Sequence, residues 1–480
     1  MANKFYITTT LPYINANPHI GYAREIIEAD VLARFHRLLG DEVFFNTGTD
    51  EHGLKIFRKA QELGMETQKY CDEKALEFDR LKSVLNLSYD NFIRTNDENH
   101  IKAVQEFWKI CDKNGYIYKK NYKIKYCVGC ELEKTDSELV DGKCPDHPNM
   151  ELETIEEENY FFRYSAFQEK LTELYKNNSA FVLPEKRFNE VKAFLERGLQ
   201  DFSISRLKDK MPWGVPVPGD NNQVIYVWFD ALVNYISAIG WSSFAKATNG
   251  KIENKNNFEK WWPAVQLCGK DNLRPQSAMW QAMLIAANLP PSLQIFVNGF
   301  ITVNSQKMSK SLGNVISPYE MVSKFGIDGT RYLLLAGPNF GEDFDITWEK
   351  LIEKYNADLA NGLGNLVSRV TKLAENLQFQ VLKKISNDQF SNLINKLELG
   401  QALEYIWKII DENNKFIGDN KPWELVKTNQ EKFEEVMQKL LEDLNLISEL
   451  LASFMPETSH KIKKALETKK IEEVLFQRIK

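Results

Sequence analysis

The segment spanning residues 4–46 constrains the fold more than any other, because it predicts a strand, a loop, a helix and a second strand. Apolar residues alternate around Phe5 and Ile7, a Pro/Asn-rich loop covers residues 11–18, and Val43 to Asn46 predicts the second strand. The helix between them ends at Gly40, and one of its faces is apolar: Ile27, Val31, Phe35 and Leu38. This order opens a doubly wound parallel α/β sheet, which binds ligands at the carboxyl ends of its strands.

The rest of the chain divides into an interrupted α/β part and a helical part. The alternation breaks at residues 119–220, and parallel-type strands are expected again at 224–229, 265–268 and 295–297. From about residue 350 the pattern is helical, with apolar stripes that predict packing faces: Leu399, Leu403, Ile406 and Ile410, then Val436, Leu440, Leu444, Ile447 and Leu451. We therefore expect a split Rossmann-like domain (1–118 and 221–295), an insertion (119–220), a loop region (296–350) and a helical bundle (351–480).

Composition excludes several classes of protein. The 480 residues exceed what one core holds, and 43% apolar with 27% charged residues is typical of a globular protein. No apolar stretch reaches the roughly 20 residues that span a bilayer, and the N-terminus lacks a signal-peptide layout, so we expect no membrane association and a cytoplasmic location. The formal charge of -6 argues against a basic nucleic-acid coat, and the lysine-rich stretches 119–125 and 461–470 are interpreted first as solvated faces.

Three of the six cysteines cluster, whereas Cys71, Cys111 and Cys268 lie in apolar stretches and are expected in the core. Cys127 and Cys130 form one CxxC hook, and Cys144 with His147 forms a second hook after thirteen residues. Three thiolates and one imidazole at this spacing fit a closed tetrahedral zinc site. With four protein ligands there is no open position for water, so one structural Zn²⁺ is predicted. A zinc-ribbon nucleic-acid module is the alternative, but it explains nothing outside the hooks.

Two short motifs lie in loops of this arrangement. Pro18-His19-Ile20-Gly21 follows the first strand, and Lys307-Met308-Ser309-Lys310-Ser311 lies in a Gly/Ser/Asn-rich segment. A close-packed turn with an imidazole can approach a triphosphate, and a lysine loop supplies cations at the phosphorus under attack. Either motif alone is weak evidence, but together and in this order they resemble the ATP-binding signatures of class I aminoacyl-tRNA synthetases.

Further stretches make the chain resemble the methionyl-tRNA synthetases, specifically the bacterial type with a single zinc knuckle. Besides the two motifs and the knuckle, the resemblance rests on Leu11-Pro12-Tyr13, residues 47–53, Ser203-Ile204-Ser205-Arg206, residues 226–231, Gly269-Lys270-Asp271 and residues 361–366. It covers nearly the whole chain. It implies that methionine and ATP form methionyl-adenylate, and that the methionyl group is transferred to the terminal adenosine of tRNA(Met).

The resemblance also implies roles for individual residues. His19, Gly21, Tyr22 and Asp271 would bind ATP together with Lys307 and Lys310, of which His19 and the two lysines would be catalytic, and Mg²⁺ is expected with the nucleotide. Asp50 would bind the methionine ammonium group, and an apolar slot would hold the thioether: Leu11, Tyr13, Trp228, Ala231, Tyr235, Gln276 and Trp280. The helical tail would bind the anticodon, with Asn365 and Arg369 on one helical face and Trp423 in a loop after Pro422. A monomer is expected.

The chain departs from the family pattern at three places. Tyr22 stands where the first signature usually has histidine. Asn272, Pro275 and Gln276 replace the usual residues beside the predicted side-chain pocket, and Leu232 replaces a common proline there.

Other functions remain alternatives at this point. A class I ligase for another apolar amino acid would share both motifs, although the branched-chain members usually carry a larger editing insertion. A small-molecule nucleotidyltransferase would share the phosphate chemistry without needing the helical tail. A non-catalytic RNA-binding relative could lose Lys310 or Asp50, and both are present.

Overall fold

The computed structural model describes residues 3–130, 132–134, 138–241, 253–308, 313–338, 340–375, 377 and 388–480. The chain forms two compact units. Unit 1 comprises Met1–Asn17, Glu42–Arg80 and Tyr89–Val297, and unit 2 comprises Pro18–Asp41, Leu81–Ser88 and Asn298–Lys480. Among the described residues, no helix has both the length and the apolar character needed to cross a membrane.

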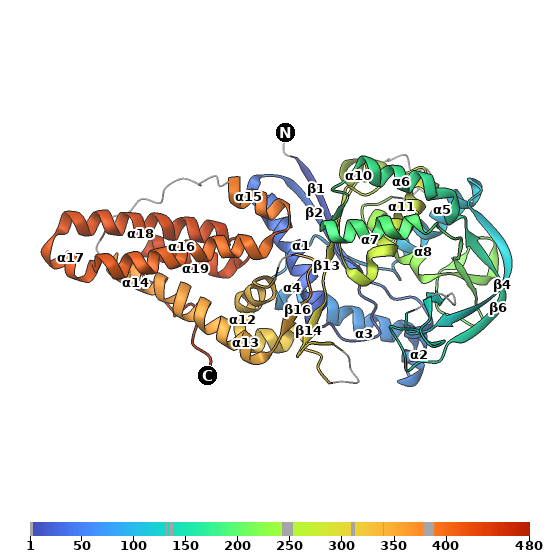
Figure 1. The fold of residues 1–480 in the computed structure, drawn as a ribbon, viewed down its shortest axis with the longest axis horizontal. Coiled ribbons are helices and arrows are strands. Elements are labelled where there is room, and N and C mark those ends of the chain that lie inside the picture. Colours follow the sequence, from blue (N-terminus) through green and yellow to red (C-terminus); the bar gives the residue numbers. More distant parts are fainter. Residues whose placement is uncertain are drawn as a thin grey trace. The chain divides into compact units, whose positions relative to one another are not determined.

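A six-stranded sheet organises unit 1, in the order β3-β2-β1-β12-β13-β7. Figure 1 labels three of its strands, β1, β2 and β13. Its strands are β1 (Lys4–Thr8), β2 (Glu42–Thr49), β3 (Asn91–Arg94), β7 (Val182–Leu183), β12 (Val265–Gly269) and β13 (Gln294–Asn298). The pairs β1–β2, β1–β12, β2–β3 and β7–β13 are parallel. Ile7, Phe45 and Leu267 are fully buried, as expected for a sheet covered on both faces. The split, doubly wound sheet predicted from the sequence is confirmed.

Short helices connect these strands and carry much of the aromatic core. They are α2 (Leu54–Glu62), α3 (Thr67–Asp79), α5 (Glu98–Lys113), α6 (Gln168–Asn177), α7 (Glu185–Glu196), α8 (Val227–Ala231), α9 (Asn234–Ser237), α10 (Glu253–Trp261) and α11 (Trp280–Ala286). Phe107 of α5 stacks on Trp280 and meets Phe229 edge to face. Cys71, Cys111 and Cys268 are fully buried, which confirms them as core residues.

Two antiparallel sheets interrupt the parallel one. The first has the order β5-β4-β6-β8 and the second β10-β11-β9, formed by β4 (Ile117–Cys127), β5 (Leu132–Lys134), β6 (Glu153–Phe162), β8 (Phe202–Ser203), β9 (Ser205–Leu207), β10 (Pro216–Val217) and β11 (Asp220–Ile225). Lysines of β4 pair with acids: Lys119 with Asp220 at 2.9 Å and Lys123 with Glu156 at 2.9 Å. Lys119 and Lys123 of the lysine-rich stretch are therefore exposed and paired with acids, as interpreted from the sequence.

Three local predictions were wrong. Residues 224–229 do not form a parallel strand, because β11 ends at Ile225 in an antiparallel sheet and α8 begins at Val227. A short apolar run cannot distinguish these outcomes by periodicity. Leu38 does not join the buried face of its helix, since it is 43% exposed in the last turn. Trp423 lies in a helix, not in a loop, because Pro422 occupies the first helical position.

Unit 2 combines a small sheet with long helices. Its sheet has the order β15-β14-β16, and the elements before the bundle are α1 (Ile20–Leu39), α4 (Leu81–Val84), β14 (Ile301–Val303), β15 (Gln306–Lys307), α12 (Pro318–Leu335), β16 (Phe344–Ile346) and α13 (Trp348–Lys354). A π-helical segment, Tyr355–Gly364, then leads into α14 (Asn365–Leu373), α15 (Asp388–Asn395), α16 (Leu399–Asn420), α17 (Pro422–Thr428), α18 (Gln430–Leu451) and α19 (Pro456–Thr468). In Figure 1, α14, α16, α18 and α19 lie side by side as a bundle, and every residue of both predicted stripes is buried.

A fully buried ion pair ties these parts of unit 2 together. Arg331 of α12 lies 2.8 Å from the carboxylate of Asp30 on α1, and neither side chain is exposed. Its guanidinium also donates to the carbonyl oxygens of Phe454, Ser453 and Leu85. One side chain thus connects α1, the segment after α4 and the end of the bundle.

Candidate active site and metal cluster

His19 caps the first helix of unit 2. Its backbone is extended, and its Nδ1 accepts a hydrogen bond from the Gly21 amide at 3.1 Å. A Cβ placed on Gly21 would lie 2.9 Å from His19 Cε1 and 3.6 Å from the methyl group of Met308. Because glycine has no Cβ, the His19 ring and Met308 can lie close to the backbone of this turn. The helix N-terminus adds a partial positive charge that suits a phosphate group.

The second motif starts beside this turn. Lys307 ends β15, and its ammonium group lies 4.6 Å from the centre of the Phe300 ring. The hairpin before it turns at Asn304 and Ser305, both in the left-handed region with φ of 53° and 60°. Met308 approaches Gly21, so unit 2 brings the starts of the two motifs together. Ser309, Lys310 and Ser311 lie outside the described residues, as does Leu312.

The predicted ammonium-binding carboxylate lies beside the first loop of unit 1. Asp50 forms a bridge with Tyr13, its amide donates to Pro12 O at 3.0 Å, and its carbonyl accepts from Ile14 at 3.3 Å. Asp50 is only 8% exposed. The Lys55 ammonium lies 5.9 Å from the centre of the Tyr13 ring, a distance at which a cation and an aromatic ring attract each other.

The predicted side-chain pocket falls into two clusters of unit 1. Tyr13 and Trp228 pack against the same buried group, which contains Tyr126 and Tyr226. Trp228 is half-buried, and its indole nitrogen has no hydrogen-bond partner in the structure. Ala231 follows on the same helix, and Leu11 is also buried.

The second cluster joins Tyr235, Gln276 and Trp280. The Tyr235 hydroxyl donates to Gln276 Oε1 at 2.9 Å, and the Tyr235 ring lies 5.9 Å from that of Trp280. Gln276 lies in a π-helical turn, Pro275–Met279, a conformation that is frequent at functional sites. Its Nε2 is buried and has no hydrogen-bond partner among the described residues. Trp280 is fully buried and stacks on Phe107, so packing alone already accounts for much of its surface.

The predicted ATP-binding residues outside the two motifs differ in exposure. Asp271 is exposed in a 3-10 turn after β12, and a Cβ on Gly269 would lie 2.7 Å from its Oδ1. A carboxylate folded over a glycine at the end of a parallel strand is accessible to a hydroxyl-bearing ligand. Tyr22, by contrast, is only 9% exposed.

Cys127, Cys130, Cys144 and His147 converge on one point of unit 1. Their donor atoms all lie within 4.8 Å of one another. Cys130 Sγ lies 3.4 Å from Cys144 Sγ and 3.2 Å from His147 Nδ1, too far for a disulfide and close to the roughly 3.5–3.8 Å edges of a tetrahedral zinc site. A Cβ on Gly129 would lie 2.5 Å from the His147 ring, so the glycine leaves room for the imidazole. The four residues can hold a metal ion.

The predicted anticodon residues are brought together in unit 2. Asn365 and Arg369 are exposed on α14, and the Arg369 guanidinium lies 5.8 Å from the centre of the Trp423 ring. Trp423 is 43% exposed. An exposed indole beside a guanidinium can stack on an unpaired base.

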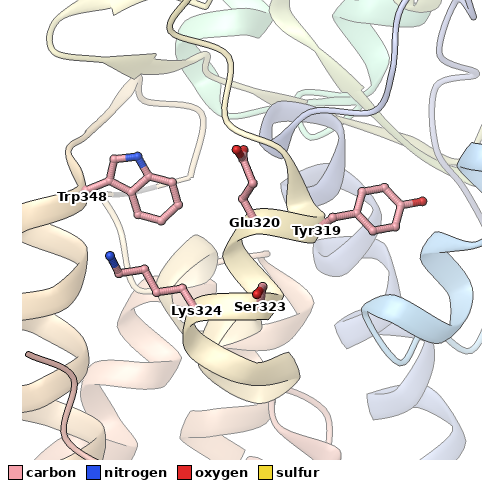
Figure 2. Close-up of a pocket in the computed structure, with 5 residues that line it drawn as sticks. All are labelled: Tyr319, Glu320, Ser323, Lys324 and Trp348. Atoms are coloured by element: carbon pink, nitrogen blue, oxygen red, sulfur yellow. The ribbon is translucent and has the colours of Figure 1, made fainter.

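Sequence reasoning missed two further features. Unit 2 has a hollow of about 500 Å³ lined by Tyr319, Glu320, Ser323, Lys324 and Trp348. Figure 2 shows Trp348 and Lys324 on one side and Tyr319 on the other. The sequence indicates where α12 starts, through the capping box at Ser317, but it does not indicate the hollow.

The second missed feature is a buried contact in unit 1 between two histidines and one aspartate. His52 and His100 both contact the carboxylate of Asp230. His52 and Asp230 lie in stretches that carry the family resemblance, but nothing in the sequence indicates that they meet.

Comparisons with known proteins agree over nearly the whole chain. A family model described as tRNA synthetases class I (M) matches residues 5–154 and 148–371, and one described as the anticodon binding domain of methionyl tRNA ligase matches residues 364–475. The methionine–tRNA ligase of Thermotoga maritima is 41% identical over 96% of this chain and 74% of its own length. That of Synechocystis sp. is 40% identical over 95% and 88%. A structure of Mycobacterium tuberculosis methionyl-tRNA synthetase in complex with methionyl-adenylate matches with a TM-score of 0.88 and 35% identity, covering 96% of this chain and 93% of that one.

Proposed function

Because this chain belongs to the methionyl-tRNA synthetase family, we infer that it is an ATP-dependent methionine–tRNA ligase. It activates L-methionine as methionyl-adenylate and transfers the methionyl group to the 3′-terminal adenosine of tRNA(Met), for initiation and elongation. The observation that carries the site assignment is the approach of Met308 to Gly21, since it unites two motifs that are weak evidence separately.

We assign ATP binding to residues of the two motifs and to Asp271. His19 and Gly21 would meet the triphosphate at the start of α1, Lys307 and Lys310 would neutralise its charge, and Asp271 would bind the ribose. The burial of Tyr22 supports a phenol that shapes the turn instead of a charged phosphate ligand. Mg²⁺ is proposed to arrive with ATP.

Methionine is proposed to bind in unit 1. Asp50 would pair with the ammonium group near Tyr13, and Leu11, Trp228 and Ala231 would line the apolar slot. Tyr235 and Gln276 would form its polar end, with Trp280 supporting them from the core. An apolar slot with a few placed polar groups suits an unbranched, polarizable thioether.

The chemistry needs alignment and charge neutralisation more than proton transfer. A methionine carboxylate oxygen, ionised at neutral pH, attacks the α-phosphorus of ATP; the bond to the bridging oxygen breaks and pyrophosphate leaves. A ribose hydroxyl of the terminal adenosine then attacks the methionyl carbonyl; the bond from the carbonyl carbon to the phosphate oxygen breaks, AMP leaves and the hydroxyl proton is released. Negative charge moves onto the leaving pyrophosphate, which His19, Lys307 and Lys310 would stabilise.

We propose that the Cys127, Cys130, Cys144 and His147 cluster holds one structural Zn²⁺. Three thiolates and an imidazole are ligands that zinc prefers, and the convergence of the four donors supports a closed site. Removing the metal should loosen residues 119–150 and slow catalysis. An unchanged melting curve after chelation would contradict this role.

The proposed partners are ATP, L-methionine and a tRNA with a CAU anticodon, which Asn365, Arg369 and Trp423 would contact. The protein is proposed to act as a monomer in the cytoplasm, where ribosomes consume charged tRNA. A sedimentation measurement showing a stable dimer would contradict the first of these statements.

Methionine-dependent ATP–pyrophosphate exchange, measured across the standard amino acids, tests the activity. Methionine should give by far the strongest signal. No methionine signal, or a stronger signal with leucine or valine, would refute the proposed specificity.

A matched lysine pair tests the second motif. Lys310→Ala should abolish exchange without unfolding the protein, because it removes a cation from the phosphates. Lys432→Ala, which only breaks an exposed pair with Glu435 on α18, should leave exchange unchanged. Full activity in Lys310→Ala would remove its catalytic role.

A further inference from the structure

The carboxylate of Asp230 is shared by two imidazoles in the interior of unit 1. His52 Nδ1 lies 2.6 Å from Oδ2, and His100 Nε2 lies 3.0 Å from Oδ1. Asp230 and His100 are fully buried, and His52 is 4% exposed. The three residues come from distant parts of the chain: the loop after β2, helix α5 and helix α8. This cluster has no place among the ATP-binding, methionine-binding, metal-binding or tRNA-binding residues assigned above.

The hydrogen bonding fixes which groups donate. An ionised carboxylate only accepts, so each imidazole must present an N–H to Asp230. The other nitrogen of His100 lies 2.8 Å from Ser237 Oγ, whose hydroxyl can donate to it. Burial alone would raise the pKa of Asp230, but the contacts with His52 and His100 outweigh it and hold that pKa below its usual range. The cluster is therefore a satisfied, charged hydrogen-bond network.

The network joins the two segments that would bind methionine. His52 comes two residues after Asp50, while Asp230 comes two residues after Trp228 and directly before Ala231. The 2.6 Å bond thus couples the ammonium-binding loop to the helix that would line the thioether slot. Trp213 packs its ring 5.9 Å from the His52 ring, and its Nε1 donates to Glu51 O at 2.6 Å, which holds the loop from its other side.

We propose that His52, Asp230 and His100 are positioning residues that set the spacing between the two halves of the methionine site. This inference rests on the proposed function, because it assumes that Asp50, Trp228 and Ala231 bind methionine. The network touches no reacting atom. Its loss should therefore weaken methionine binding and leave ATP binding and the chemical step nearly unchanged.

A pair of substitutions at His52 separates positioning from packing. Asparagine places an amide N–H near the site of Nδ1, whereas leucine fills similar space without a donor. In ATP–pyrophosphate exchange, His52→Leu should raise the KM for methionine by about ten- to a hundredfold, the range for losing a hydrogen bond to a charged group. The KM for ATP and kcat should stay within about threefold, and His52→Asn should recover most of the methionine affinity.

His36 supplies a matched control, because its Nδ1 also contacts a carboxylate, that of Asp41, at 2.8 Å in unit 2. His36→Leu should leave the KM for methionine unchanged. The inference is overturned if folded His52→Leu keeps the wild-type KM for methionine, or if His52→Asn is as impaired as His52→Leu.

Two further variants decide the matter if His52→Leu does not fold. His100→Gln retains a donor near Nε2, and Ser237→Ala removes only the outer partner of that imidazole. Ser237→Ala should raise the KM for methionine by about two- to fivefold. His100→Gln keeps the donor to Asp230 but also loses the contact with Ser237, so its KM should rise by no more than the same factor. An unchanged KM in Ser237→Ala overturns the inference. Failure of the proposed function is distinct, since the wild-type protein would then lack methionine-dependent exchange.

Discussion

Replacing Arg331 by methionine should destabilise unit 2 more than almost any other single substitution. The guanidinium is fully buried and makes four contacts of 2.7–3.1 Å, one with the Asp30 carboxylate and three with backbone carbonyl oxygens. Methionine fills part of the volume but leaves the carboxylate and carbonyls without these donors. Because neither charge is exposed, solvent does not screen the loss, and breaking such a pair costs about 3–5 kcal/mol.

Calorimetry and hydrogen exchange measure this loss. For a unit of this size, the cost corresponds to a fall in melting temperature of about 6–20 °C. Exchange should accelerate most at the amides of α1 and α12, which the side chain connects. In the double variant Arg331→Met/Asp30→Asn the buried charge is also gone, so part of the lost stability should return.

Two results would refute this reasoning. A loss below about 1 kcal/mol in Arg331→Met would mean that the pair contributes no more than an exposed one. The Asp30 carboxylate keeps Arg34 at 2.7 Å, so a double variant less stable than the sum of the two single variants would mean that losing Arg331 from this carboxylate is not the source of the cost.

Three further predictions concern other positions. Gly129→Ala should weaken metal binding, because its Cβ would lie 2.5 Å from the imidazole ligand, and competition with a chelator measures the affinity; wild-type affinity would contradict the geometry. Gly48→Ala should cost about 1–3 kcal/mol in unfolding experiments, since its Cβ would lie 1.8 Å from the carbonyl oxygen of Ile93, while Gly418→Ala, with no neighbour within 4 Å, should be neutral or stabilising. Burial would raise the pKa of Asp30, but Arg331, Arg34 and Ser88 together hold that pKa below its usual range. The stability from these contacts is therefore full above the unfolded value of about 4 and is lost as pH falls through the folded pKa, and Asp30→Asn should flatten the acid unfolding curve there.

The sequence was sufficient to predict the long periodic helices. It was also sufficient to predict that the four possible metal ligands, three cysteines and His147, lie together. The helix from Ile20 to Leu39 ends where Gly40 adopts the left-handed conformation with φ of 90°, the expected stop signal. Both apolar stripes of the bundle are buried as predicted. A 3.6-residue period over a long segment fits a helix with one apolar face and does not fit a strand. The paired hooks of cysteine and histidine converge because their spacing is local.

Features that depend on distant contacts could not be predicted. The apolar run around Val227 fits a strand as well as a helix, and the contacts that accompany the helix involve residues far away in the chain. Asp230 meets His52 across 178 positions and His100 across 130. A loop is expected at Trp423 after Pro422, but proline at the first helical position also starts helices, as it does here.

The pairing of β1 with β12 has a consequence for how the protein is made. Ile7 pairs with Val265, and the Tyr6 hydroxyl reaches the Tyr235 carbonyl across 229 positions. At translation rates of about 5–20 residues per second, the first strand waits roughly 13–50 s for its partner to be synthesised. During that interval β1 can pair with β2 on one side, but its edge that later pairs with β12 is open, the kind of surface on which nascent chains aggregate. Chains truncated before β12 should therefore bind chaperones or precipitate, whereas the proposed metal ligands, all contained in residues 127–147, would emerge early enough to close around an ion first.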